Sequence, residues 1–161
     1  MADVMESALA QADAANAEGG THYAASRFEE AEKAYSRAID AAGVAPRDAL
    51  ALRLAVYYSN RSQARLRLES NKYAAHDAAL ALSFDPSQLK AALRHALALE
   101  RLGRTAEAIS SAKHLAGSAS ALPERLAREV AALLQRLTQA AAAEADSAPT
   151  GAATPSHRVP T

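Results

Sequence analysis

Two cations lie one helical turn apart in the segment DPSQLKAALRHALALERLGR, which runs from Asp85 to Arg104. Lys90 and Arg94 are four residues apart, so a helix would place their side chains next to each other. Lysine and arginine donate charge-assisted hydrogen bonds to carboxylates, and each such bond contributes roughly 1.5–3 kcal/mol. The spacing therefore predicts a site for an acidic ligand, provided that other elements place these cations on an open surface.

The other reactive side chains form no catalytic or metal-binding pattern in the sequence. The chain has no cysteine, which excludes disulfides and thiolate chemistry. None of its five histidines has a metal-ligand spacing with another His, Asp or Glu, and HExxH is absent. The pair Gly19-Gly20 lacks the Lys and Ser/Thr that follow a phosphate-binding loop. We therefore expect no enzyme, no metal and no cofactor.

Length and charge narrow the class of protein further. A chain of 161 residues fits one domain with a tail, and 18 Lys and Arg balance 18 Asp and Glu. Zero net charge argues against a nucleic-acid binder, although a local basic patch is still possible. The first residues have no basic region followed by an apolar run, and no stretch reaches the ~18 apolar residues of a membrane span. The expectation is a soluble, cytoplasmic protein that binds neither nucleic acid nor membranes.

Apolar residues recur at helical spacing along most of the chain. The pattern predicts seven helices, at about residues 8–25, 28–42, 47–69, 73–83, 87–102, 105–117 and 123–143. Ser26 is expected to cap the second helix, Asp85 to cap the fifth, and Gly103 to end the fifth. From residue 144 the apolar period is lost, and residues 144–161 are predicted to be a disordered tail.

The helical segments also repeat along the chain. Small residues align when the first unit is laid on the second and the second on the third. The aligned positions are Gly19, Ser62 and Ala96 in the first helices, and Ala31, Ala74 and Ala108 in the second helices. The step from the first unit to the second is longer by nine positions, which fit an insertion around residues 45–53. The pattern indicates three units of equal length, each a pair of helices.

A period of about 34 residues built from helix pairs resembles the tetratricopeptide repeat (TPR). The segments FEEAEKAYSRAI, YSNRSQARLRLE and DPSQLKAALRHALALERLGR resemble its co-chaperone branch, including the myosin-directed co-chaperones. The resemblance implies an all-α fold, a right-handed α-solenoid of three TPR helix pairs plus a C-terminal capping helix. The TPR domain is expected at residues 12–143. Its repeats would span about 12–45, 55–88 and 89–122, and its capping helix 123–143. The alternative is a plain helical bundle with accidental alanine periodicity.

Stacked helix pairs wind into a superhelix whose concave face is lined by the first helix of each pair. We expect this face to carry four cations, which are Lys90, Arg94, Arg67 and Arg101. We also expect it to carry Asn60 of the second unit, and Asn16 and Tyr23 of the first unit. Only one carboxylate, that of Asp13, is expected to oppose them. A basic groove in a neutral protein suits an extended acidic peptide, and a free C-terminus is a common target of such capture.

The resemblance implies a more specific ligand. Co-chaperone repeats of this kind bind the acidic C-terminal tails of cytosolic heat-shock chaperones, of the seventy- or ninety-kilodalton classes, through a dicarboxylate clamp. This chain matches three clamp positions with Asn60, Lys90 and Arg94. It has Asn16 where the family has a lysine, and Gly20 where the family has an asparagine. Loss of two donors would remove roughly 2–5 kcal/mol of interaction.

The sequence therefore predicts a monomeric, non-enzymatic adaptor that binds such tails through Asn60, Lys90 and Arg94. Further candidate contacts are Asn16, Tyr23, Arg67 and Arg101. The alternative is a structural TPR scaffold in a multiprotein complex, in which the groove is degenerate and binds no peptide. A solvated face without any ligand would account for the same charged residues.

Overall fold

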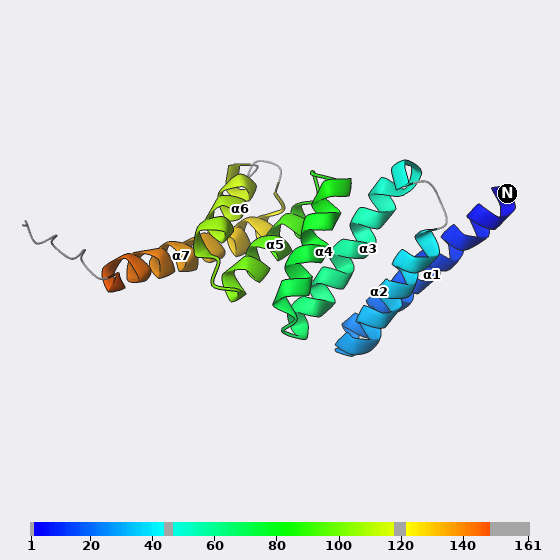
Figure 1. The fold of residues 1–161 in the computed structure, drawn as a ribbon, viewed down its shortest axis with the longest axis horizontal. Coiled ribbons are helices and arrows are strands. Elements are labelled where there is room, and N and C mark those ends of the chain that lie inside the picture. Colours follow the sequence, from blue (N-terminus) through cyan, green and yellow to red (C-terminus); the bar gives the residue numbers. More distant parts are fainter. Residues whose placement is uncertain (1, 44–46, 118–121, 149–161) are drawn as a thin grey trace, which may run out of the picture.

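The computed structural model describes residues 2–43, 47–117 and 122–148, which form helices and the turns between them (Figure 1). The helices of these residues are α1 (Ala2–Ala24), α2 (Phe28–Ala42), α3 (Arg47–Arg67), α4 (Asn71–Phe84), α5 (Leu89–Arg101), α6 (Thr105–Gly117) and α7 (Glu124–Ser147). Their number and order agree with the sequence prediction, and no described residue lies in a strand. None of the described helices combines the length and the apolar character needed to cross a bilayer.

Two helix ends differ from the prediction by more than two residues. Helix α1 begins at Ala2 rather than near residue 8, and α7 continues to Ser147 instead of ending at residue 143. The predicted tail therefore starts too early, because residues 144–147 are helical; residues 149–161 lie outside the described part of the chain. The run of alanines before Glu144 has no apolar period, but alanine is the strongest helix former.

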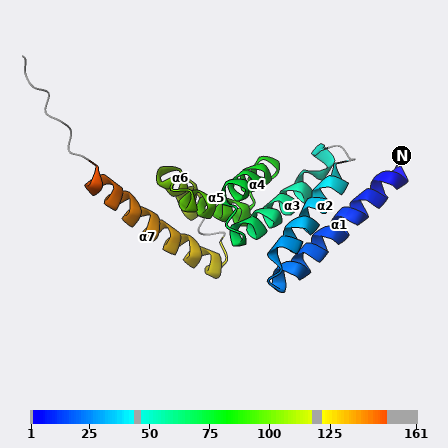
Figure 2. The ribbon, with the colours of Figure 1, turned by 60° about the horizontal axis from the view of Figure 1, so that its bottom comes forward.

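The helices pack as three consecutive pairs that follow one another along the molecule, and α7 closes the array (Figures 1 and 2). Helix α1 packs on α2, α3 on α4 and α5 on α6, while α2 contacts α3 and α4 contacts α5. The first helices of neighbouring pairs also touch directly, α1 with α3 and α3 with α5. The predicted all-α solenoid of three helix pairs with a final capping helix is confirmed.

The three first helices end in the same turn. Ser26, Glu69 and Gly103 have left-handed backbones, with φ of 59°, 58° and 71°. In each turn the following N–H is donated to a carbonyl five residues earlier, as in Arg27 to His22 at 2.9 Å. The three positions are separated by the same two intervals as Gly19, Ser62 and Ala96 of the sequence repeat. The backbone therefore follows the repeat found in the sequence.

Two expected helix caps are wrong. Ser26 does not cap α2, because it occupies the left-handed position of the turn and Arg27 takes the capping position without a side-chain hydrogen bond. Asp85 does not cap α5, which begins only at Leu89. The Asp85 carboxylate instead accepts hydrogen bonds from the N–H of Ser87 at 3.0 Å and from its hydroxyl at 2.6 Å. It therefore stabilises the turn before the helix. Gly103 ends α5 as predicted.

Small residues allow the close approach of the two helices in each pair. Ala31, Ala74 and Ala108 have no exposed surface. Gly19 is required by the first pair, because a Cβ atom added there would lie 2.5 Å from Cε1 of Tyr35. Helix α1 continues without interruption through Gly19-Gly20.

The insertion lengthens the first helix of the second pair. Helix α3 has 21 residues, whereas α5 has 13. Its additional turns carry Leu50 and Leu54, which are buried in a cluster with Ala12, Ala38 and Tyr57. At the other end of the array, Val130, Leu133 and Leu137 of α7 are buried against α5 and α6. Helix α7 thus covers the apolar side of the third pair, as a capping helix does.

Candidate functional site

The predicted site residues come from the three first helices. Asn16 and Tyr23 lie on α1, Asn60 and Arg67 on α3, and the remaining three on α5: Lys90, Arg94 and Arg101. We call the surface formed by these residues of α1, α3 and α5 the first-helix face. Contacts between α1 and α3, and between α3 and α5, bring parts of this face together, although the residues are far apart in sequence.

Asn16 and Asn60 are direct partners. The Nδ2 of Asn60 donates a hydrogen bond to Oδ1 of Asn16 at 3.0 Å, across the contact between α1 and α3. Both side chains are partly buried. This bond uses one of the two N–H groups of Asn60, which was predicted to donate to a ligand. The second N–H and Oδ1 of Asn60, together with Nδ2 of Asn16, have unused hydrogen-bonding capacity. One donor and one acceptor side by side can bind a peptide backbone.

Arg94 is held in place by α3. Its Nη1 donates to the carbonyl oxygen of Ser59 at 2.8 Å and to the Ser59 hydroxyl, and its Nη2 donates to Oε1 of Gln63 at 2.6 Å. Burial lowers the pKa of Arg94 to about 10, an effect that nearby Tyr23 and Tyr35 partly oppose. The guanidinium is therefore still charged at neutral pH. No carboxylate of the described residues forms an ion pair with it.

Lys90 lies one turn before Arg94 on α5 and is exposed. Within the described ranges it forms no salt bridge, so its ammonium group is available to a ligand. Gly20 occupies the clamp position where the family has an asparagine, and it is exposed. No atom lies within 4 Å of the place that a Cβ would take there. This position leaves open space and offers no side-chain donor.

The expected carboxylate of the groove, Asp13, is already engaged. It accepts a hydrogen bond from the Tyr57 hydroxyl and lies 3.5 Å from Nε of Arg53. Burial, together with this bond to Asp13, raises the pKa of Tyr57, which keeps its proton. Asp13 therefore belongs to the contact between α1 and α3, and its charge is largely balanced there.

Arg67 and Arg101 lie at the C-terminal ends of α3 and α5 and line one pocket of about 670 Å³ with Leu66, Glu69 and Asn71. The Arg67 guanidinium carbon lies 4.6 Å from the centroid of the Phe28 ring. Tyr23 packs edge-on against the same ring, with centroids 5.2 Å apart. Tyr23 therefore serves packing at this end of the face.

The sequence pattern did not predict that two arginines of α3 would stabilise the fold. Arg61 binds the buried carboxylate of Asp77 through Nε at 2.8 Å and Nη2 at 2.9 Å, and Arg65 binds it through Nη1 at 2.8 Å. Arg65 also reaches Glu32 of α2 at 2.7 Å. Burial by itself would lower the pKa of Arg61, but its bonds to Asp77 raise it. We call these four residues the Asp77 network.

Ser59 and Gln63, which orient Arg94, were expected on the same inward side of α3 as Asn60, but not as partners of Arg94. Ser59 and Gln63 are four residues apart on α3, so they lie on one side of the helix. In the structure, positions 59 and 63 lie against the next first helix, α5. The spacing of four was the signal that could have found them.

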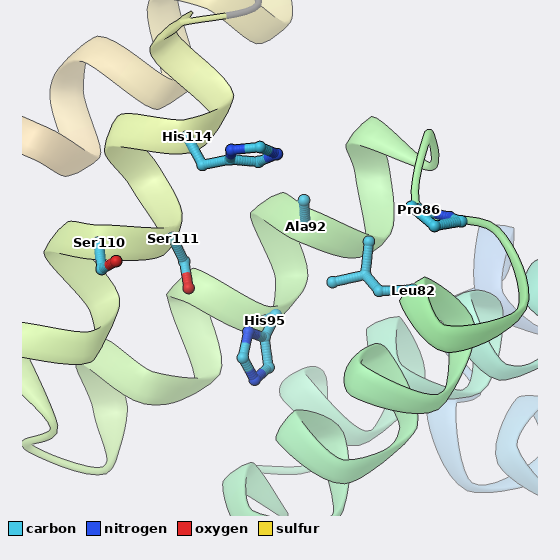
Figure 3. Close-up of a pocket in the computed structure, with 7 residues that line it drawn as sticks. All are labelled: Leu82, Pro86, Ala92, His95, Ser110, Ser111 and His114. Atoms are coloured by element: carbon cyan, nitrogen blue, oxygen red, sulfur yellow. The ribbon is translucent and has the colours of Figure 1, made fainter.

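A second pocket, of about 380 Å³, lies between α4, the α4–α5 turn, α5 and α6 (Figure 3). It is lined by Leu82, Pro86, Ala92, His95, Ser110, Ser111 and His114. Burial lowers the pKa of His95, so this side chain is neutral at pH 7. None of the predicted site residues lines this pocket. In the described part of the chain, no group of three His, Asp or Glu is placed to hold a metal ion.

Comparison with known proteins gives relatives in sequence and in structure. No family model matches the chain. It is 34% identical over 110 residues to the mouse protein unc-45 homolog B, which covers 67% of this chain and 11% of that protein. The chain therefore spans about a tenth of the length of this curated relative.

Three solved structures share the fold. The Arabidopsis OM64 TPR domain has a TM-score of 0.70 and 26% identity, covering 82% of this chain and 98% of that one. The TPR2B domain of yeast Sti1, solved as a complex with pHsp70, has a TM-score of 0.69 and 28% identity, covering 80% and 97%. The first TPR of Spaghetti (RPAP3), bound to the HSP90 peptide SRMEEVD, has a TM-score of 0.68 and 23% identity, covering 83% and 95%.

Proposed function

We propose, on the premise that this chain is a tetratricopeptide repeat domain similar to those of Hsp70- and Hsp90-binding co-chaperones, that it is a non-enzymatic adaptor for heat-shock chaperones. Its first-helix face would form a concave basic groove for their acidic C-terminal peptides. The TPR2B domain of Sti1 and the first TPR of Spaghetti, which share its fold, were solved with such chaperone peptides. We place the adaptor in the cytoplasm and expect it to bind as a monomer.

Arg94 is the observation that carries this proposal. A largely buried cation is costly unless an opposite charge or hydrogen bonds compensate it. Ser59 and Gln63 satisfy two of its nitrogens but carry no negative charge. A ligand carboxylate would supply that charge, and the fixed guanidinium would lose little freedom on binding. Lys90, exposed one turn away, would bind the same acidic group.

Asn16 and Asn60 have a different role from the family's clamp in this proposal. Their mutual hydrogen bond orients the two amides, and the unused N–H and carbonyl groups would bind the peptide main chain. The missing lysine and the open position at Gly20 remove two donors for the terminal carboxylate. We therefore expect an affinity below that of a full clamp by roughly 2–5 kcal/mol.

A titration with the peptide SRMEEVD tests the proposal. The free-acid peptide should bind, and the same peptide with an amidated C-terminus should bind roughly tenfold more weakly or worse, since one charge-assisted carboxylate contact is lost. Lys90→Ala should remove most of the affinity. Lys72→Ala is the matched control, because Lys72 is an exposed lysine of α4 outside the first-helix face. Equal binding of the acid and the amide would contradict capture of a C-terminus.

The second candidate is a structural TPR scaffold whose groove binds no peptide. It is favoured by the internal bonds of Asn60 and Arg94, which already use donors that a ligand would need. The double variant Lys90→Ala/Arg94→Ala separates the two functions. A scaffold would keep all its pull-down partners in this variant, whereas the adaptor would lose its chaperone.

A further inference from the structure

A second basic site lies on the first-helix face, away from Lys90 and Arg94. Arg67 is the last residue of α3 and Arg101 is the last residue of α5, and the two positions lie one repeat apart in the sequence. Both line the pocket of about 670 Å³ that also contains Leu66, Glu69 and Asn71. The two arginines thus occupy equivalent positions in the second and third repeats and share one open space.

Both guanidinium groups are held in place although both residues are exposed. Arg67 lies over the face of Phe28, at 4.6 Å from the ring centroid. Arg101 donates through Nη1 to the carbonyl oxygen of Leu66, near the end of α3. Neither arginine forms a salt bridge within the described ranges. These contacts position the two cations and leave most of their N–H groups free.

The lining of the pocket leaves an excess of positive charge and one unused acceptor. Glu69 is the only carboxylate among the lining residues, against two guanidinium groups. Oδ1 of Asn71 is buried and has no hydrogen-bond partner in the described structure. Buried polar atoms are normally satisfied, so this oxygen is an exception within the described structure. A peptide with an acidic side chain supplies the negative charge that the pocket lacks.

The distance between the two basic sites defines the spacing of the ligand. Arg67 follows Asn60 by seven residues on α3, and Arg101 follows Arg94 by seven residues on α5. Seven residues of an α-helix advance about 10 Å. A peptide in the polyproline II conformation advances about 9 Å in three residues, and its side chains return to the same direction after three residues. The two sites therefore match positions three residues apart in an extended peptide.

We propose that Arg67 and Arg101 form a second anion site, which binds the acidic side chain three residues before the C-terminal residue of the peptide. This inference rests on the proposed function, in which the C-terminal carboxylate lies at Lys90 and Arg94. The SRMEEVD peptide has a glutamate at this position and a second glutamate one residue later, which provides an internal control.

The test compares three peptides: SRMEEVD, a version with the glutamate three residues before the end replaced by glutamine, and a version with the next glutamate replaced instead. The first replacement should weaken binding about three- to fivefold, as expected for a solvent-exposed charge pair, and the second should have less effect. Arg67→Gln should abolish the difference between SRMEEVD and the first replacement. Arg125→Gln, at an exposed arginine of α7, should leave this difference unchanged.

Arg101→Gln should act like Arg67→Gln, but Arg101 also contacts the end of α3, so thermal unfolding of every variant is followed in parallel. Arg67→Gln is the primary variant, because Arg67 donates no hydrogen bond within the described structure. The second site is overturned if both glutamine peptides weaken binding equally, or if Arg67→Gln preserves the selectivity. Failure of SRMEEVD itself to bind would overturn the proposed function, and this site with it.

Discussion

Helix α3 lies between two groups of arginines that differ in whether a carboxylate balances their charge. On the side facing α2 and α4, Arg61 and Arg65 are paired with the fully buried carboxylate of Asp77. On the first-helix face, Arg94 is largely buried but has only neutral partners, Ser59 and Gln63. The comparison teaches that the same residue type serves the fold where its charge is balanced, and is available to a ligand where its charge is not.

Removal of the buried carboxylate should give the largest effect on stability. Asp77→Ala leaves Arg61 and Arg65 partly buried without their shared counter-charge, which should reduce the free energy of unfolding by about 3–5 kcal/mol. Urea unfolding followed by circular dichroism measures this change. Asp40→Ala, at an exposed position of α2, is the control and should change stability by no more than about 0.5 kcal/mol. A similar stability for both variants would remove the distinction between the two groups of arginines.

Replacement of the unbalanced arginine should affect binding more than folding. Arg94→Met keeps much of the side-chain volume and leaves no carboxylate unpaired, so stability should change by less than about 1.5 kcal/mol. Affinity for the free-acid peptide should fall by about 1.5–3 kcal/mol, since a charge-assisted bond is lost. Calorimetric titration and urea unfolding of the same preparation measure both quantities. A large loss of stability without loss of affinity would show that Arg94 serves the fold.

A donor added to the groove should increase affinity. Gly20→Asn introduces an amide into open space at the clamp position that this chain lacks. One additional hydrogen bond should strengthen peptide binding by about 0.5–1.5 kcal/mol. Gly20→Ala is the control for helix stability, because it improves helix propensity without adding a donor. If both variants bind alike, the added amide does not reach the ligand.

The smallest expected effect is that of salt, which should weaken peptide binding and leave the Asp77 network nearly unchanged. Exposed charges are screened beyond about 8 Å at 0.15 M salt, whereas buried pairs are screened much less. Peptide affinity, which depends on exposed Lys90, should therefore fall as salt rises from about 0.05 to 0.5 M. The Asp77 network should respond differently. The difference in urea midpoint between the original chain and Asp77→Ala should stay nearly constant over the same range of salt. An affinity that is independent of salt would contradict a charge-held ligand.

The architecture was predictable from the sequence because it depends on local and periodic signals. Apolar spacing predicted the helices, and the two intervals of the sequence repeat predicted which positions are equivalent. The left-handed turns at Ser26 and Glu69 were not predictable, because neither residue is a glycine and only Gly103 carries the usual signal. The extension of α7 to Ser147 was missed because alanine supports a helix without any apolar period.

The site was predictable only in part. Equivalence of repeat positions placed Asn60 and Arg94 on adjacent first helices, and the structure has α3 and α5 in contact. The sequence could not show that their donors have partners within the chain, because this depends on the detailed packing of α1, α3 and α5. The pairing of Asp77 with Arg61 and Arg65 was missed for the same reason, since 16 and 12 residues separate these groups.

The linear stacking of the helix pairs has a consequence for how the molecule opens. Beyond its own two helices, each pair mainly contacts the adjacent pairs or, in the third pair, α7, so local unfolding should start at the ends of the array and reach α3 and α4 last. A ligand that touches α1, α3 and α5 together would fasten the outer pairs to the central one. Its signature would then be slower amide hydrogen exchange in the outer pairs, including α2 and α6, which the ligand does not contact.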